Sequence, residues 1–297
     1  MKLTLKTHCK INLLLNVVGH RADGFHELEM LMMPVPLFDK LKIELTRTGI
    51  ELKCNKASIP NDTNNLAYKA AEQFKAKAQI SGGIRINLEK NIPAEAGLGG
   101  GSGNAAGTLL ALNKLHGQAL NNSTLQEIAC SLGSDVPFFM QNHPAIAKGR
   151  GETINPVGKL NLLEGKSLLL VRPQFGISTP WAYKKLSNFP VAKNRPLDQA
   201  NDLVLALKKG SLNEAYGKLY NSLELPVFNK FPLIKIIKEY ALNHGAECAL
   251  MCGSGSTVFA ICSNTKEAEF LSESFESNFA PLSMNKIITL PGEFNPF

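Results

Sequence analysis

A run rich in glycine constrains this chain more than any other feature. Residues 93–106 read PAEAGLGGGSGNAA, with five glycines among the seven positions from Gly97 to Gly103. Because glycine has no side chain, the backbone N–H groups of such a run are free to close around an anion. Apolar residues at helical spacing follow as far as Asn113 and predict a helix directly behind the run. A glycine loop that leads into a helix N-terminus suits polyphosphate, so we expect the chain to bind a nucleoside triphosphate.

Two common phosphate motifs do not explain this run. A Walker A loop requires Gly-x4-Gly-Lys-Ser/Thr, and before the one Gly-Lys-Ser of this chain Leu160 replaces the first glycine. Gly101–Ala106 fits the dinucleotide fingerprint Gly-x-Gly-x-x-Ala, but the strand predicted at residues 83–88 ends well before it. The expected acidic residue about twenty positions later is also missing, so we take this match as accidental. A glycine-rich surface loop without function is the remaining alternative, and the density of the run argues against it.

Composition indicates an ordinary globular protein with an anionic ligand. The length of 297 residues favours two domains, and 44% hydrophobic with 19% charged residues is typical of soluble proteins. The net charge of +7 suits a phosphorylated ligand. It would also suit nucleic acid, but the basic residues are scattered and form no dense run, so we expect no nucleic-acid partner.

Cysteine spacing and the N-terminus exclude several other classes. The six cysteines form no Cys-x-x-Cys, and no histidine pair has ligand spacing, so neither a zinc site nor a disulfide framework is expected. Asn12 and Asn16 interrupt the apolar run of residues 11–18, which argues against a signal peptide. No apolar run approaches the ~18 residues that span a bilayer. We therefore expect a cytoplasmic protein without a membrane partner.

Periodicity predicts an α+β fold with two sheets packed by helices rather than one doubly wound parallel sheet. The predicted strands are residues 3–6, 11–18, 41–45, 83–88, 167–171, 249–252, 258–261 and 287–290, with turns at residues 23–24 and 34–36 in the first half. The predicted helices are residues 66–77, a long helix behind the glycine run, and residues 125–132, 198–208, 212–220 and 232–243, with a helical turn beginning near residue 135. The character of the sequence changes around residues 149–156. We therefore predict one domain at 1–155 and a second at 156–297.

Lys10 and Asn12 open a strongly apolar strand. Alternation would place Lys10, Asn12 and Leu14 on one face. A lysine at a strand end is usually a solvated edge residue, and that is the default interpretation. The second polar group on the same face favours a functional pair instead.

Asp135 lies between Gly133, which ends a predicted helix, and the apolar turn Val136-Pro137-Phe138. The default interpretation is a helix N-cap, which contributes about 1 kcal/mol. The alternative is a carboxylate in a partly apolar corner that accepts a proton from a hydroxyl nucleophile.

Aromatic residues in both halves could contact a planar ring. Phe25 and His26 follow the Asp23-Gly24 turn, and Tyr183 lies in the second half. A phenylalanine is more often a core anchor, but these side chains could instead stack on a base and hydrogen-bond to it. A second small-residue loop, Gly253–Thr257, is either a tight turn or a neighbour of the glycine run.

Together these segments resemble the GHMP kinase superfamily. The resemblance rests on residues 10–13, 21–26, 93–106, 132–139 and 251–255, and so it covers most of the chain. It implies a two-domain fold, with an N-terminal domain like domain 2 of ribosomal protein S5, a ferredoxin-like C-terminal domain, and the active site in the cleft between them. Within the superfamily it implies ATP- and Mg²⁺-dependent phosphorylation of the 2-hydroxyl of 4-diphosphocytidyl-2-C-methyl-D-erythritol, in non-mevalonate isoprenoid precursor biosynthesis.

The resemblance also assigns roles. Lys10 and Asp135 would be the catalytic pair, which replaces the edge and cap interpretations. Asn12, Phe25, His26 and Tyr183 would hold the cytidine end of the substrate. Asn65 and Lys90 would lie near the adenosine. The residues around the ATP phosphates would be Pro93, Ala94, Glu95, Ala96, Gly97, Leu98, Gly99, Gly100, Gly101, Ser102 and Gly103. Metal ligands are not implied, and both a monomer and a homodimer stay open.

Two positions depart from the pattern of the superfamily branch. Gly103 replaces the usual second serine after the glycines, and His8-Cys9 replaces Pro-Ala before the lysine. The alternatives are another GHMP kinase, acting on mevalonate, homoserine or a sugar, and a catalytically silent nucleotide-binding protein of the same fold. The Asp23–His26 loop argues against the first alternative, and the presence of both Lys10 and Asp135 argues against the second.

Overall fold

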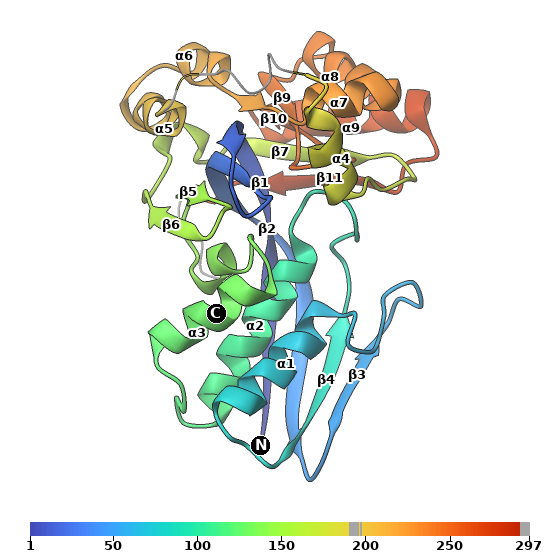
Figure 1. Ribbon diagram of the computed structural model, residues 1–297. Helices are drawn as coiled ribbons and strands as arrows, with labels where there is room; N and C mark the ends of the chain where they lie inside the picture. The colour runs from blue at the N-terminus through green and yellow to red at the C-terminus, as the bar shows by residue number, and fades with distance from the viewer. Residues whose placement is uncertain (190–195, 197, 292–297) are drawn as a thin grey trace.

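The computed structural model describes residues 1–189, 196 and 198–291, and two sheets organise it (Figure 1). The first sheet contains β1 (Lys2–His20), β2 (His26–Thr46), β3 (Ile50–Cys54), β4 (Gly83–Glu89), β5 (Ala145–Gly149), β6 (Thr153–Pro156) and β8 (Tyr220–Asn221). The second contains β7 (Ser167–Arg172), β9 (Cys248–Met251), β10 (Val258–Cys262) and β11 (Met284–Thr289). The helices are α1 (Leu66–Lys77), α2 (Gly100–Leu115), α3 (Asn122–Leu132), α4 (Thr179–Leu186), α5 (Gln199–Lys209), α6 (Leu212–Gly217), α7 (Glu224–Lys230), α8 (Pro232–Asn243) and α9 (Thr265–Phe279), with short 3-10 turns η1 (Pro137–Met140) and η2 (Asn161–Leu163).

β1 and β2 form a long antiparallel pair that runs through the middle of the molecule (Figure 1). The sequence predicted three short strands here with a break at residues 34–36, and that break is wrong because β2 continues through both prolines. β5 pairs with β2 at Leu28–Met32 and β4 pairs with it at Lys40–Thr46. The prolines lie between these two partners, where one side of β2 has no neighbouring strand and the missing N–H is tolerated.

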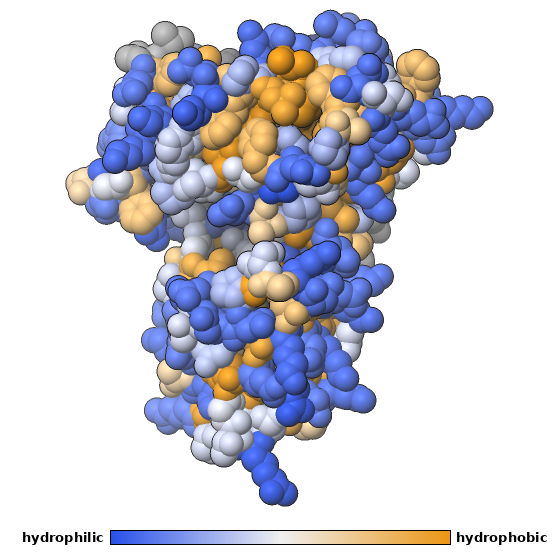
Figure 2. Space-filling view, turned by 90° about the vertical axis from the view of Figure 1, so that its right-hand side faces the viewer, coloured by the Kyte–Doolittle hydropathy of each residue, from blue (hydrophilic) through white to orange (hydrophobic). Residues whose placement is uncertain are grey.

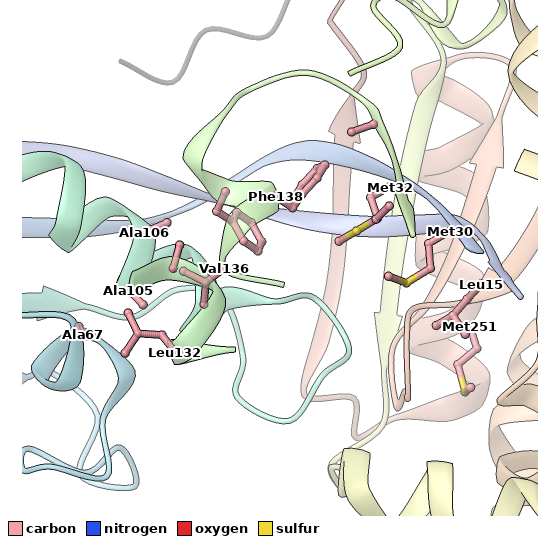
Figure 3. Close-up of a cluster of buried hydrophobic side chains, with 14 of the residues drawn as sticks. Leu15, Met30, Met32, Ala67, Ala105, Ala106, Leu132, Val136, Phe138 and Met251 are labelled. Atoms are coloured by element: carbon pink, nitrogen blue, oxygen red, sulfur yellow. The ribbon is translucent and has the colours of Figure 1, made fainter. Parts of the chain in front are cut away.

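A β-bulge in β1 sets which side chains face the functional site. Asn12 pairs with Met32 and Leu14 pairs with Leu31, so Leu13 is the extra residue. Lys10 and Asn12 share a face, as predicted, and the Lys10 ammonium donates to Asn12 Oδ1 over 2.7 Å. The bulge then shifts the alternation, and Leu15 rather than the predicted Leu14 lines the cavity beside them. Figure 3 shows Leu15 close to Met30, its partner on β2, and to Met251 of the second sheet.

Three helices cover one face of the first sheet. α1 packs against both α2 and α3, and α2 also lies along β1 (Figure 1). Small and apolar side chains fill the interface between these helices and the sheet, and Phe74 is fully buried among them. The sequence predicted α1 with its bounds at residues 66 and 77, and Asn65 caps it by accepting from Ala67 N over 2.9 Å.

The second sheet has the order β11-β7-β10-β9, with all neighbours antiparallel. With α8 before β9 and α9 before β11, this is the split βαβ arrangement of ferredoxin-like folds. The predicted α+β class with two sheets is therefore confirmed. β8 belongs to the first sheet although it lies after residue 155, so the division into 1–155 and 156–297 stays a prediction.

Apolar surface lies over the part that carries the second sheet (Figure 2). Ile236 of α8 and Phe270 of α9 are among the exposed large side chains there. Within the described ranges, no helix combines the length and apolar character needed to cross a membrane.

Phe74→Ala tests the core under α1. Removing this fully buried ring should lower the free energy of unfolding by about 3–5 kcal/mol, because a cavity replaces its contacts. Chemical denaturation measures the effect. Phe270→Ala is the matched control, since its ring is 66% exposed and should change stability by no more than roughly 0.5 kcal/mol. Equal losses from the two variants would contradict the described core.

Candidate active site

A cavity of about 910 Å³ is lined by residues of the first sheet and, from the second half of the chain, by α4 and the loop at Gly253. Most of the predicted site residues line it: Lys10, Asn12, Phe25, His26, residues 93–102, Asp135 and Tyr183. Asn65, Lys90 and Gly103 do not line it. The structure thus brings together segments from five separate stretches of the chain.

Lys10 and Asp135 form an ion pair inside the cavity. The Lys10 Nζ lies 3.5 Å from Asp135 Oδ2, and the side chains are 5% and 30% exposed. Asn12 Oδ1 accepts from the same ammonium, and Asn12 Nδ2 donates to Met30 Sδ over 3.5 Å. Lys10 is therefore no solvated edge residue. Asp135 makes no cap hydrogen bond to η1, whose N-cap is Val136, so its carboxylate is directed to the lysine and to solvent.

The glycine run forms a loop and the first turn of α2. Gly99 is the N-cap, in the left-handed region at φ 70°, and no side chain caps the helix, so its first N–H groups are available to an anion. The helix begins inside the run, at Gly100, earlier than the apolar pattern predicts. The Lys10 N–H donates to Leu98 O over 3.0 Å, which fixes the loop beside Lys10.

The second small-residue loop packs directly on the first, as one of the two interpretations proposed. A Cβ on Gly97 would lie 1.8 Å from the carbonyl oxygen of Cys252, and Gly97 has a φ of 75°. A Cβ on Gly253 would lie 3.3 Å from Lys10 Nζ. Only glycine permits this approach, so the two loops and the lysine form one unit.

Sequence reasoning missed the buried polar residues that hold this unit. Asn221 Nδ2 donates to both Met251 O and Gly253 O over 2.8 Å, and Glu224 Oε1 accepts from Met251 N over 2.9 Å. Burial raises the pKa of Glu224. Asn221 and Glu224 lie three positions apart in an otherwise apolar stretch, and this spacing could have marked them in the sequence. It does not show that they bond to Met251 and Gly253.

Arg172, at the end of β7, holds the start of the glycine-rich loop. Its guanidinium is buried and donates to Ala94 O over 3.1 Å and to Ser283 Oγ over 2.8 Å. Burial lowers the pKa of Arg172. The glycine-rich loop of the first half is therefore held in part by Arg172 of the second.

Two predicted adenosine neighbours have structural partners. Lys90 pairs with the fully buried Asp39 and donates to Asn104 Oδ1 over 3.2 Å, while Asp39 Oδ1 accepts from Ile92 N over 2.8 Å. Asn65 caps α1 and donates to Pro60 O over 2.9 Å. These contacts support the strand end and helix start next to the loop, and their predicted contact with adenosine stays a prediction.

The rings of His20, Phe25, His26 and Tyr183 line one part of the cavity, which we call the aromatic end. The His26 and Tyr183 rings lie 5.1 Å apart, and His20 lies 4.1 Å from His26 between ring centroids. Phe25 is half exposed, and the Arg150 guanidinium lies 4.7 Å from its ring centroid. Burial raises the pKa of Tyr183. The Tyr183 ring thus lies against His26. The aromatic side chains of the cavity include His20 and His26 besides Phe25 and Tyr183.

The two departures from the family pattern meet in space. A Cβ on Gly103 would lie 2.9 Å from the carbonyl oxygen of His8. The His8 ring packs 5.0 Å from Phe139, and burial lowers its pKa to about 4. His8 is therefore neutral near pH 7, and glycine at position 103 lets α2 pack closely on β1.

Known proteins match both halves of the chain. Residues 65–143 match the family model of the GHMP kinase N-terminal domain, and residues 201–281 match that of the C-terminal domain. The 4-diphosphocytidyl-2-C-methyl-D-erythritol kinase of Clostridium botulinum (strain Eklund 17B / Type B) is 36% identical, over 96% of this chain and 100% of the relative. A crystal structure of 4-(cytidine 5'-diphospho)-2C-methyl-D-erythritol kinase superposes with a TM-score of 0.80 at 32% identity, covering 98% and 100% of the two chains.

The chain belongs to the GHMP kinases, in the branch of the 4-diphosphocytidyl-2-C-methyl-D-erythritol kinases. The fold predicted from the resemblance is confirmed, and the chain is an ATP-dependent small-molecule kinase. A homoserine kinase from Cytophaga hutchinsonii has the same fold, with a TM-score of 0.76 at 17% identity over 98% of this chain and 96% of its own. The fold is thus shared across GHMP kinases with different names.

Gly97→Ala tests the contact between the two loops. The added methyl should collide with Cys252 O, displace the phosphate loop and weaken ATP binding by at least tenfold, measured by calorimetry. Gly117→Ala is the control, because Gly117 also has a positive φ but no atom within 4 Å of an added Cβ. ATP affinity that falls equally in both variants, or in neither, would contradict the loop contact.

Proposed function

We propose that this kinase transfers the γ-phosphoryl group of ATP to the 2-hydroxyl of 4-diphosphocytidyl-2-C-methyl-D-erythritol. The observation that carries the proposal is the arrangement of one cavity. The Lys10–Asp135 pair lies beside the glycine loop, and the rings of His26 and Tyr183 lie in the same cavity. The first group suits phosphoryl transfer, and the second suits a planar base that carries hydrogen-bonding groups.

Asp135 acts on the acceptor hydroxyl. Its carboxylate is 30% exposed and lies on the cavity wall, so it can accept the proton as the oxygen attacks phosphorus. Lys10 lies 3.5 Å from this carboxylate and stabilises negative charge on the transferring group. Asn12 fixes the ammonium through its hydrogen bond of 2.7 Å. Positioning and electrostatics of this kind supply most of the catalysis in phosphoryl transfer.

The loop residues fit the triphosphate of ATP with its Mg²⁺. The uncapped start of α2 offers backbone N–H groups, and the Ser102 hydroxyl lines the cavity on its first turn. The described residues include no cluster of three side chains suited to a metal, so Ser102 would join water and phosphate oxygens around the ion. When bound, Mg²⁺ neutralises phosphate charge.

Phe25, His26 and Tyr183 would hold the cytidine end. Asn12, which the resemblance also assigns to that end, is bonded here to Lys10 Nζ and Met30 Sδ, and its contact with cytidine stays a prediction. Tyr183 comes from α4 and His26 from the start of β2, so the base would be held between the two halves of the molecule. This position directs the rest of the acceptor along the cavity toward Asp135. A cytoplasmic location and the choice between monomer and homodimer stay predictions.

Asp135→Asn should keep the fold and lower kcat by roughly 10²–10⁴, because the amide cannot accept the proton. Steady-state kinetics and thermal melting measure the two effects. Asp198→Asn is the control, since Asp198 is an exposed carboxylate that does not line the cavity. An unchanged kcat in Asp135→Asn would remove Asp135 from the mechanism.

ADP release with Mg²⁺-ATP and a panel of acceptors tests the function itself. Turnover should be confined to 4-diphosphocytidyl-2-C-methyl-D-erythritol, with none on mevalonate, homoserine or galactose. Turnover on another acceptor alone would keep the kinase and discard the cytidine site. ATP binding without any turnover would favour the silent nucleotide-binding protein.

A further inference from the structure

The turn between β5 and β6 carries Arg150, which has no part in the phosphoryl transfer proposed for Lys10 and Asp135. The turn reads Gly149-Arg150-Gly151-Glu152, and both glycines have positive φ, 74° and 114°. Glu152 folds back so that its Oε2 accepts from the Arg150 backbone N–H over 2.5 Å. The turn is therefore locally fixed, and it presents the Arg150 side chain to the cavity.

This turn packs on the catalytic loop. A Cβ on Gly151 would lie 3.0 Å from Met30 Cε and 3.3 Å from the carbonyl oxygen of Ser134. Ser134 precedes Asp135, and Met30 accepts the hydrogen bond from Asn12. The turn thus packs against both the loop that carries Asp135 and Met30 of β2, and both of these line the cavity.

The Arg150 side chain extends from this turn toward the aromatic end. Its guanidinium lies 4.7 Å from the Phe25 ring centroid, a cation–π distance that restricts the orientation of the planar group. Its ion pair with Glu152 is long, 3.9 Å from Nε to Oε1. The Arg150 side chain is 29% exposed at the cavity wall, and its guanidinium keeps donors for a ligand.

Charge decides which ligand group this arginine suits. The acceptor of the proposed function carries a diphosphate between its base and its reacting hydroxyl. Among the described residues, the lysines and arginines of the cavity wall are Lys10, Arg150 and Lys184. Lys10 is paired with Asp135, and Lys184 is an exposed residue of α4. Arg150 is the one that lies on the aromatic side with its orientation restricted by a ring.

We propose that Arg150 binds the diphosphate of the acceptor and sets specificity for a nucleoside diphosphate-linked substrate. This inference rests on the proposed function. A guanidinium donates two parallel hydrogen bonds to phosphate oxygens, and Phe25 keeps it in that orientation. Phe25 then acts partly through Arg150 rather than only on the base.

Arg150→Met tests the assignment, with Arg150→Lys as the conservative variant. The KM for the acceptor should rise roughly 10- to 100-fold in Arg150→Met, the effect of losing charge-assisted hydrogen bonds, while the KM for ATP stays within about twofold. Calorimetry should show the same loss for CDP and almost none for cytidine, which has no phosphate. Arg150→Lys should recover part of the CDP affinity. Lys148→Met is the control, because Lys148 lies on the same strand pair but outside the cavity wall.

Four results would overturn the assignment. Equal losses of CDP and cytidine affinity would show that Arg150 only shapes the aromatic loop. A rise in the KM for ATP with unchanged CDP affinity would assign the arginine to the other substrate. If the wild-type protein neither binds CDP nor turns over the acceptor, the proposed function fails as well, whereas unchanged CDP affinity in Arg150→Met refutes this inference alone.

Discussion

The arrangement of the site depends on one buried cation. The Lys10 side chain is 5% exposed, and an ammonium at such a position costs several kcal/mol unless partners compensate it. Asn12 and Asp135 supply those partners, and the Gly97 and Gly253 loops enclose the ammonium from the other side. Each partner comes from a different part of the fold, so the charge of Lys10 requires β1, the loop before η1 and both glycine loops to be placed together.

This requirement explains why the two halves of the molecule share polar contacts. Arg172 of the second sheet hydrogen-bonds to Ala94 of the phosphate loop, and Asn221 joins β8, beside β1, to the loop at Gly253. The nucleotide loop is therefore a joint product of both sheets. These contacts hold together the parts of both halves that line the cavity.

The sequence predicted local elements well and long-range contacts poorly. The bounds of α1 and α8 follow from caps, proline and apolar spacing, and the pairing of Lys10 with Asn12 follows from strand alternation. α9 was missed although Asn264 and Glu267 form a capping pair at its start. No spacing rule reveals that Gly97 touches Cys252, or that a bulge exchanges Leu14 for Leu15, because both depend on which strands become neighbours.

A crystal structure of the ternary complex with a non-hydrolysable ATP analogue and 4-diphosphocytidyl-2-C-methyl-D-erythritol would test whether Asp135 and the aromatic end bind the acceptor. We expect the acceptor 2-hydroxyl within hydrogen-bond distance of Asp135, in line with the γ-phosphate, and the cytosine against the rings of His26 and Tyr183. A 2-hydroxyl far from Asp135, or a cytosine outside the aromatic end, would contradict it.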